Sequence, residues 1–233
     1  MKIVFLNCWD ATMSENLARF LLKHREDTDI FCFQEAEEKF VALAETHLED
    51  FTLRSVTTRG FRQQRDNYTN NTYIQKNLIE TQSQALLVHE EGCGVGLYSE
   101  IGDGDKKLSV INFHGQWQPG TKVDTEVRLK QSRLLLEFLK DKKKPHIVGG
   151  DFNLLLDTES VRMFEEAGYR NLIRDFDIKT TRNQISWDMW PDLPKQLWAD
   201  FVFVSTDIKV KSFVVPEDDE SSDHLPMILE VDL

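Results

Sequence analysis

The sequence predicts an α/β fold in which two β-sheets pack against each other and helices cover their outer faces. Apolar stretches of strand length alternate with amphipathic helical stretches along all 233 residues. The two halves of the chain also share an order of elements, in which a strand ending in an acidic residue, Glu35 or Asp151, precedes a helix and further strands. No linker or low-complexity stretch divides the halves, so we expect a single domain over residues 1–233.

The elements expected in the first half are strands at residues 2–7, 29–34 and 51–57 and helices that begin at Thr12 or Ser14 and near residue 36. Either Thr12 or Ser14 would cap the first helix, whose apolar residues fall on one face. Residues 54–76 follow, with five basic residues and one acidic residue. Their Gln, Asn and Thr content indicates a long loop or an irregular hairpin.

The second half is expected to begin with strands at 83–89, 93–99 and 107–113. A long helix then begins at Asp124 or Thr125 and ends near Lys142. The later elements are a strand leading into Asp151, a helix over about 157–167, a short strand near 170–173, a loop with Trp187 and Trp190, and strands at 198–204, 207–215 and 226–231.

Composition and charge limit the classes of function. With 40% apolar and 29% charged residues, the chain can form a sizeable core and a normal solvated surface. No apolar run approaches the roughly 20 residues of a membrane span, and the N-terminal apolar run is too short for a signal peptide. The cysteines Cys8, Cys32 and Cys93 lack metal-type spacing and are expected to be reduced. We therefore expect a cytoplasmic monomer.

The formal net charge of −12 argues against tight nonspecific binding to a nucleic-acid backbone, which requires a basic surface. It does not exclude a nuclease, because an acidic metal site contains several carboxylates by design.

The most informative motif is Gly149-Gly150-Asp151-Phe152-Asn153. The apolar run before it indicates a buried strand that brings Asp151 and Asn153 to its carboxyl end, while Phe152 points into the core. The glycines would let the backbone turn tightly and let a ligand come close. An ordinary turn explains the motif equally well, because Gly, Asp and Asn are turn-forming residues.

Other strand ends also carry polar residues between apolar flanks. They are Asn7, Glu35, His114, Asp200 and the pair Asp223-His224. Each has a structural explanation by itself: a carboxylate can cap a helix, a histidine can lie satisfied in the core, and a loop pair can be solvated. Asp200 is more unusual, because an acid in an apolar run is costly unless it is paired or bound to a metal. Since a sheet aligns its strand ends, we expect these residues to meet.

The combined motifs resemble the endonuclease/exonuclease/phosphatase family. The resemblance covers residues 2–231 and is carried by Asn7, Phe33-Gln34-Glu35, Asn112-Phe113-His114, Gly150-Asp151-Phe152-Asn153, Asp200-Phe201-Val202-Phe203-Val204-Ser205 and Ser222-Asp223-His224-Leu225-Pro226. It implies a DNase I-like four-layer α/β-sandwich and Mg²⁺-dependent cleavage of a phosphoester. Family members act on DNA, poly(A) tails, inositol phosphates, sphingomyelin and tyrosyl-DNA linkages.

The resemblance also implies metal and water-activating roles for individual residues. Glu35 would be the principal metal ligand, with Asn7 and Asp223 near the same ion, and oxygen ligands suit Mg²⁺ or Mn²⁺. Asp151 would orient or deprotonate the attacking water, and Asn153 would hold a phosphate oxygen or that water.

The same resemblance assigns roles toward the phosphate. His224 would donate to a nonbridging phosphate oxygen while Asp200 orients its ring and favours its protonated form. His114 would face the phosphate and serve the leaving group.

Two differences in sequence narrow the branch of the family that the chain is expected to resemble. Apurinic endonucleases carry an acid where this chain has Trp9, and they lack a histidine at the position of His114. The match therefore favours the nuclease, deadenylase and phospholipase-like branches. Gly115-Gln116-Trp117 after His114 also departs from the leucine that is common there.

Several features leave the substrate open. The basic segment 54–76, with Phe61, Tyr68 and Tyr73, could bind phosphates and stack on bases, or it could be a solvated loop that balances an acidic body. Packing is the favoured role for Trp187 and Trp190. The acidic run 217–220 would repel a long polyanion, which favours a small or single-stranded substrate over duplex DNA.

The function predicted from the sequence is hydrolysis of a phosphodiester, with a nuclease as the first hypothesis and single-stranded nucleic acid as a candidate partner. The alternatives are a phosphomonoesterase or a lipid or inositol headgroup hydrolase, and a catalytically inactive binding domain on the same fold.

Overall fold

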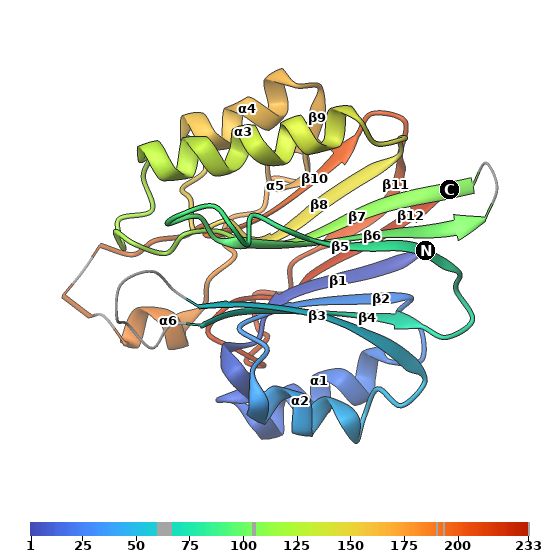
Figure 1. Cartoon of the computed structure of the whole chain (residues 1–233). Helices are drawn as coiled ribbons and strands as arrows, with labels where there is room; N and C mark the ends of the chain where they lie inside the picture. The colour runs from blue at the N-terminus through green and yellow to red at the C-terminus, as the bar shows by residue number, and fades with distance from the viewer. Residues whose placement is uncertain (60–66, 104–105, 190, 193, 233) are drawn as a thin grey trace.

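The computed structural model describes residues 1–59, 67–103, 106–189, 191–192 and 194–232. Two six-stranded mixed sheets pack face to face, and helices lie on the outer side of each sheet, giving four layers (Figure 1). This arrangement confirms the predicted α/β sandwich.

The first sheet has the strand order β11-β12-β1-β2-β4-β3. Its strands are β1 (Lys2–Asn7), β2 (Ile30–Gln34), β3 (Phe51–Arg59), β4 (Asn67–Gln75), β11 (Lys209–Val214) and β12 (Met227–Asp232). β1 and β2 are parallel and are the strands that lead to the site. The 3₁₀ turn η1 (Trp9–Ala11) and the helices α1 (Ser14–His24) and α2 (Glu38–Glu45) belong to this half.

The second sheet has the strand order β5-β6-β7-β8-β10-β9. Its strands are β5 (Glu80–Leu86), β6 (Val95–Asp103), β7 (Lys106–His114), β8 (His146–Asp151), β9 (Tyr169–Asn171) and β10 (Asp200–Ser205). The helices that follow these strands are α3 (Glu126–Lys140), α4 (Glu159–Glu166), α5 (Leu172–Asp175) and α6 (Gln184–Asp188). α3 and α4 cover the outer face of the sheet, whereas α6 lies on the side of the molecule opposite the two termini (Figure 1).

Local sequence accounts for the two long helices but not for both predicted caps. α1 buries Leu17, Phe20 and Leu21 on one face. The Thr125 hydroxyl caps α3 by accepting a hydrogen bond from the Arg128 backbone nitrogen at 3.2 Å. The predicted cap of α1 is wrong, because Met13 occupies the cap position and forms no side-chain cap hydrogen bond.

The glycines of the central motif allow close packing inside the fold rather than a turn beside a ligand. Gly149 and Gly150 lie within β8. A Cβ atom on Gly149 would lie 2.7 Å from the Phe5 ring of the opposite sheet. One on Gly150, whose φ is +133°, would lie 2.1 Å from the Phe113 carbonyl oxygen. The predicted strand is present, and the tight turn predicted at these glycines is wrong because both lie inside the strand, whereas the close approach of a ligand stays a prediction.

The basic segment contains more regular structure than predicted. β3 and β4 form an antiparallel hairpin that pairs Phe51 with Gln75 and Arg59 with Asn67. Asn70 and Asn71 are fully buried, and their amides donate to backbone carbonyls, among them Val95 and Ala36. Phe61, Arg62, Arg65 and Trp190 lie outside the described residues. The proposed role of the segment in phosphate binding stays a prediction.

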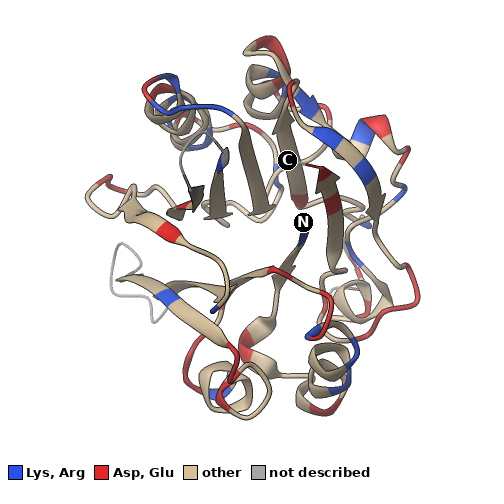
Figure 2. Cartoon of the chain, turned by 90° about the vertical axis from the view of Figure 1, so that its right-hand side faces the viewer, with Lys and Arg blue, Asp and Glu red and all other residues tan. Residues whose placement is uncertain are grey.

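Most of the Lys, Arg, Asp and Glu residues lie on the helices and the connecting segments (Figure 2). None of the helices described by the structure is long and apolar enough to span a membrane. The thiols of Cys8 and Cys32 are buried and free, and Cys93 is half-buried and free.

Candidate active site

The site is built on one row of residues that crosses the second sheet. Asp151, the last residue of β8, is paired in register with His114 at the end of β7 and with Asp200 at the start of β10. All three side chains are almost completely buried. Strand pairing therefore fixes the relative positions of two carboxylates and an imidazole without any help from loops.

The first sheet adds Asn7 and Glu35 at the carboxyl ends of β1 and β2. The Asn7 amide donates to Glu35 Oε1 at 2.9 Å and to Asp151 Oδ2 at 3.0 Å. This amide therefore joins carboxylates from the two sheets. Its oxygen accepts from the Trp9 backbone nitrogen at 3.1 Å.

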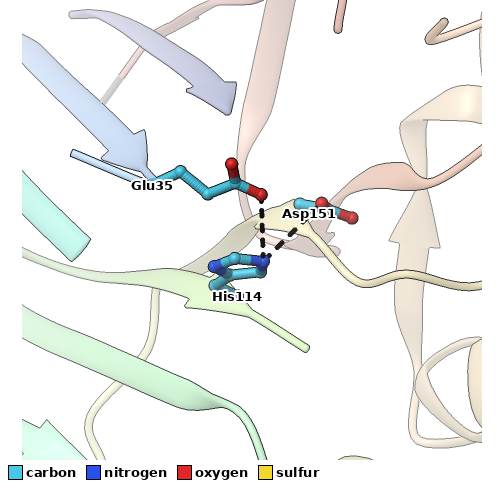
Figure 3. Close-up of side chains that lie close together, drawn as sticks. All are labelled: Glu35, His114 and Asp151. Carbon is cyan, nitrogen blue, oxygen red and sulfur yellow. Dashed lines mark ion pairs between the residues drawn. The ribbon is translucent and has the colours of Figure 1, made fainter. Parts of the chain in front are cut away.

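His114 lies between the carboxylates of Glu35 and Asp151 (Figure 3). Its Nε2 atom is 3.9 Å from Glu35 Oε1 and 3.8 Å from Asp151 Oδ2. Its other nitrogen, Nδ1, has no hydrogen-bond partner among the described residues. The Tyr68 ring packs edge-on against the imidazole, with ring centroids 4.7 Å apart.

His224 is held by Asp200 on one side and faces the site with the other. Its Nδ1 atom is 2.9 Å from both Asp200 oxygens. Its Nε2 atom is 3.7 Å from Asp151 Oδ2 and 2.5 Å from Nη1 of Arg182. Arg182 also pairs with Asp223 Oδ2 at 3.0 Å.

Asn153 completes the set and contacts a buried lysine. Its backbone nitrogen donates to Asp151 Oδ1 at 2.8 Å, and its side-chain nitrogen donates to the Gly115 carbonyl at 3.1 Å. The Lys122 ammonium donates to Asn153 Oδ1. Glu35, Lys122 and Asn153 have φ angles of 51°, 56° and 54°, a left-handed conformation that asparagine tolerates but that is unfavourable for Glu35 and Lys122.

The charges around Asp151 favour its ionised form. Burial by itself would raise the pKa of Asp151, but the neighbouring His224, Lys122 and His114 outweigh burial and hold the pKa below its usual range. The opposite balance applies to His224. Burial and Arg182 lower its pKa, whereas Asp200, Asp223 and Asp151 raise it, and the net result is a raised pKa.

Glu35 and His114 are both shifted toward their neutral forms. Removal from water raises the pKa of the Glu35 carboxyl to about 6, although 39% of the side chain remains exposed and the Asn7 hydrogen bond opposes the shift. Burial lowers the pKa of His114 to about 4. His114 is therefore neutral at pH 7 and can offer a nitrogen lone pair.

The donor set suits a divalent cation. Glu35, His114 and Asp151 each present an atom within 4.8 Å of the others, and Asp151, Asp200 and His224 form a second such group. The four site carboxylates, those of Glu35, Asp151, Asp200 and Asp223, outnumber the basic side chains Lys122 and Arg182, so a dication would balance negative charge at the site. Asp223 lies outside both groups and is paired with Arg182.

A cavity of about 370 Å³ opens beside these residues. Its lining consists of Trp117, Gly120, Lys122, Asn153, Arg182, Ser186, Trp187, Pro194, Lys195 and Gln196. Trp187, for which packing was the favoured role, therefore lines a cavity next to the site.

All the residues predicted for the site meet at this end of the sandwich, whereas Lys122 and Arg182 were missed. Lys122 lies in the segment between β7 and α3, and Arg182 lies between α5 and α6. Arg182 reaches the site because it forms an isolated antiparallel bridge with His224. Neither residue ends a strand, so the strand-end pattern gave no signal for them. The position of Lys122 three residues before the helix cap Thr125 is a local feature that could have drawn attention to it.

This fold, with its acidic and histidine-containing strand ends, defines a phosphoesterase scaffold of the DNase I type. A family model described as the Endonuclease/Exonuclease/phosphatase family matches residues 6–224, and the chain belongs to that family. Members of the family hydrolyse phosphoester bonds. The resemblance predicted from the motifs is confirmed. No curated protein sequence matches the chain.

Solved structures share the fold at low sequence identity. A functionally unknown conserved protein from Enterococcus faecalis is 18% identical with a TM-score of 0.75, and 100% of this chain and 99% of that chain are covered. A mannosyl-6-phosphatase from Bacteroides thetaiotaomicron is 15% identical with a TM-score of 0.73, and the match covers 100% of this chain and 100% of that chain. TDP2 from D. rerio, complexed with single strand DNA product, is 14% identical with a TM-score of 0.73, with 100% and 99% covered.

Proposed function

We propose that this protein is a Mg²⁺-dependent phosphoesterase that hydrolyses a phosphodiester, with a nuclease as the primary candidate. The observation that carries the proposal is the position of Asp151. It lies in register with His114 and Asp200, contacts the Asn7 amide, and is surrounded by groups that keep it ionised. A buried carboxylate in such a setting is suited to acting on water.

Glu35 would be the principal ligand of Mg²⁺, and Mn²⁺ fits the same oxygen donors. A bound dication would neutralise charge on the phosphate and polarise its oxygens. Asn7 now donates from its nitrogen to Glu35, so a half-turn of the amide would present its oxygen to the same position. Asp223 would lie near the ion as the family resemblance implies, while Arg182 holds its carboxylate in place.

Asp151 and Asn153 would position the attacking water. Hydrolysis joins the water oxygen to phosphorus and breaks the bond to the leaving oxygen, which must gain a proton. The lowered pKa of Asp151 makes it a weak base, which favours orientation of the water over full removal of its proton. Asn153, fixed by Gly115 and Lys122, would hold the water or a phosphate oxygen.

His224 and Arg182 would stabilise the negative charge that develops on the phosphate. Asp200 fixes the His224 ring through Nδ1, which leaves Nε2 directed at the site. A guanidinium can only donate, so His224 Nε2 accepts from Arg182 in the present arrangement. Protonation of Nε2 would end that contact, and a nonbridging phosphate oxygen would then accept from both Nε2 and Arg182. His114, close to both Glu35 and Asp151, would face the phosphate and serve the leaving group.

The comparisons support two alternatives of substrate class. TDP2 has been seen with a single-strand DNA product, which agrees with a phosphodiesterase, and the mannosyl-6-phosphatase agrees with a phosphomonoesterase or headgroup hydrolase. An inactive binding domain is disfavoured, because every predicted catalytic position holds a competent residue. A cytoplasmic location and a monomeric state remain predictions.

The test is a substrate panel with Mg²⁺ or EDTA: single-stranded DNA, duplex DNA, RNA, bis(4-nitrophenyl) phosphate, and phosphorylated inositol and lipid headgroups. His224→Ala is the control for a contaminating enzyme. We expect metal-dependent cleavage that this variant loses. Absence of turnover together with absence of Mg²⁺ binding would favour the inactive-domain alternative.

A further inference from the structure

The cavity next to Asn153 is reached by two cations that the predicted catalytic set does not include. Lys122 is only 7% exposed, and among the described residues its ammonium forms no ion pair with a carboxylate. Its ammonium donates a hydrogen bond to the neutral Asn153 amide. The nearby carboxylates of Asp151 and Asp200 favour the charged form of this ammonium, but neither pairs with it directly, and an anionic ligand in the cavity would give it a direct ion pair.

Arg182 lies at the junction between the cavity and His224. One of its terminal nitrogens faces His224 Nε2 and the other pairs with Asp223, yet the side chain also lines the cavity. Lys122 and Arg182 therefore border the space between Asn153 and the cavity from different segments of the chain. A phosphate placed there would have its reacting side toward Asp151 and its substituent toward the cavity.

Away from these cations, two tryptophans, Trp117 and Trp187, line the cavity. Trp187 is held rigidly, because its indole nitrogen donates to the Gln196 carbonyl at 3.2 Å and the Lys195 ammonium lies 4.4 Å from its ring centroid. Trp117 is 41% exposed, while its backbone is fixed by hydrogen bonds from Arg128 and to Tyr68. A large exposed indole on a fixed backbone is a ready surface for a flat ligand.

We propose that this cavity is a nucleoside subsite, in which Lys122 and Arg182 bind phosphate oxygens and Trp117 and Trp187 contact the base esterified through its sugar to that phosphate. The proposal rests on the proposed phosphoesterase function and specifies its substrate as a nucleotide or the terminal nucleotide of a single strand.

Size and lining favour this ligand over others. At about 370 Å³ the cavity is near the lower end of the roughly 300–1,000 Å³ typical of small-ligand sites, so it fits one nucleotide unit and not a duplex. Two indoles and Pro194 give the cavity the apolar surface that a flat base needs, beside the polar side chains of Ser186, Lys195 and Gln196. The acidic run Glu217–Glu220 lies close to Arg182, because the neighbouring Asn183 donates a hydrogen bond to the Asp219 carbonyl. This acidic run would repel a long polyanion.

Binding tests the subsite independently of turnover. Calorimetry would compare thymidine 5′-monophosphate with glucose 6-phosphate in the presence of Mg²⁺. Base–aromatic stacking predicts about tenfold tighter binding of the nucleotide. Trp117→Ala should remove most of this preference, Lys122→Gln should weaken both ligands, and Phe176→Ala, which alters an exposed ring outside the cavity, should change neither. Equal affinity for the two ligands in the unmodified protein would overturn the proposal.

Steady-state kinetics with two chromogenic esters distinguish a failure of the proposed subsite from a failure of the proposed activity. Thymidine 5′-(4-nitrophenyl phosphate) and methyl 4-nitrophenyl phosphate release the same chromophore from a phosphodiester. We expect kcat/KM to be about tenfold higher for the thymidine ester, with the ratio falling toward one in Trp117→Ala. Equal kcat/KM values would contradict the subsite and leave the phosphodiesterase standing. Selective nucleotide binding without hydrolysis of either ester would support the subsite and contradict the proposed activity.

Discussion

Replacing Arg128 with methionine should destabilise the protein and displace the segment that carries Lys122. Arg128 is completely buried in α3 and is the largest of the fully buried side chains. Its guanidinium donates to four backbone carbonyls of the preceding segment: Gln116 at 3.1 Å, Trp117 at 3.1 Å, Pro119 at 2.7 Å and Val123 at 2.6 Å. Methionine fills a similar length of the core but donates to none of them.

The magnitude follows from these four bonds. A hydrogen bond to a charged group contributes roughly 1.5–3 kcal/mol, so four contribute about 6–12 kcal/mol before the cost of burying the guanidinium. That cost is several kcal/mol per ion. We therefore expect a net loss of about 3–5 kcal/mol in the free energy of unfolding. For a chain of this size this corresponds to a fall in Tm of roughly 6–20 °C.

Urea unfolding of Arg128→Met should be compared with Arg133→Met, an exposed position on the same helix. The control should stay within about 0.5 kcal/mol of the unmodified protein. If the two variants differ by less than about 1 kcal/mol, the four carbonyl bonds do not hold this segment. Turnover of bis(4-nitrophenyl) phosphate at a temperature where Arg128→Met remains folded should also fall, because Lys122 loses its fixed position.

Three further predictions concern the site and the pH dependence of stability. Asp151→Asn should fold normally and lose at least ~100-fold in turnover, as expected for a positioned acid–base group; near-normal turnover would remove Asp151 from the mechanism. Glu35→Gln should raise the Mg²⁺ concentration needed for half-maximal activity, and an unchanged metal titration would rule out Glu35 as a ligand. Burial lowers the pKa of His146, so its contribution to stability is complete above the unfolded pKa of about 6.5 and declines as the pH falls below it. The free energy of unfolding measured in urea at pH 7, 6 and 5 should therefore decline more steeply for the unmodified protein than for His146→Gln, by up to about 1.4 kcal/mol per pH unit; parallel declines would refute this assignment.

The residues at the strand ends could be predicted from the sequence because each buried strand is marked by its own apolar run, and the end of that run is a local feature. An acid or histidine at the end of a buried strand has few alternative places, and the pairing of Asp151 with His114 and Asp200 follows from the alignment of β7, β8 and β10. The same logic brings Asn7 and Glu35 to the ends of β1 and β2.

Features that depend on distant partners could not be predicted in this way. β4 contains Asn70, Asn71 and Thr72, which look like loop residues until their partners are known. The two amides lie buried because backbone carbonyls elsewhere in the chain accept their hydrogen bonds. α6 has only five residues, too few for a helical period to appear. Lys122 and Arg182 reach the site through connecting segments whose path is set by tertiary contacts such as those of Arg128.

The location of positive charge decides how an acidic protein can bind an anionic substrate. The net charge of −12 gives no long-range attraction, and the two cations identified at the site, Lys122 and Arg182, are largely buried. If these two make the phosphate contacts, the apparent affinity for a single-stranded oligonucleotide should fall only about tenfold between 50 and 200 mM salt. A loss of more than about 100-fold would require several additional phosphate contacts, for which the basic residues of segment 54–76 are the evident source. Fluorescence anisotropy of a labelled oligonucleotide across this salt range, with Asp151→Asn to prevent cleavage, therefore measures whether that segment binds substrate or only balances the charge of the body.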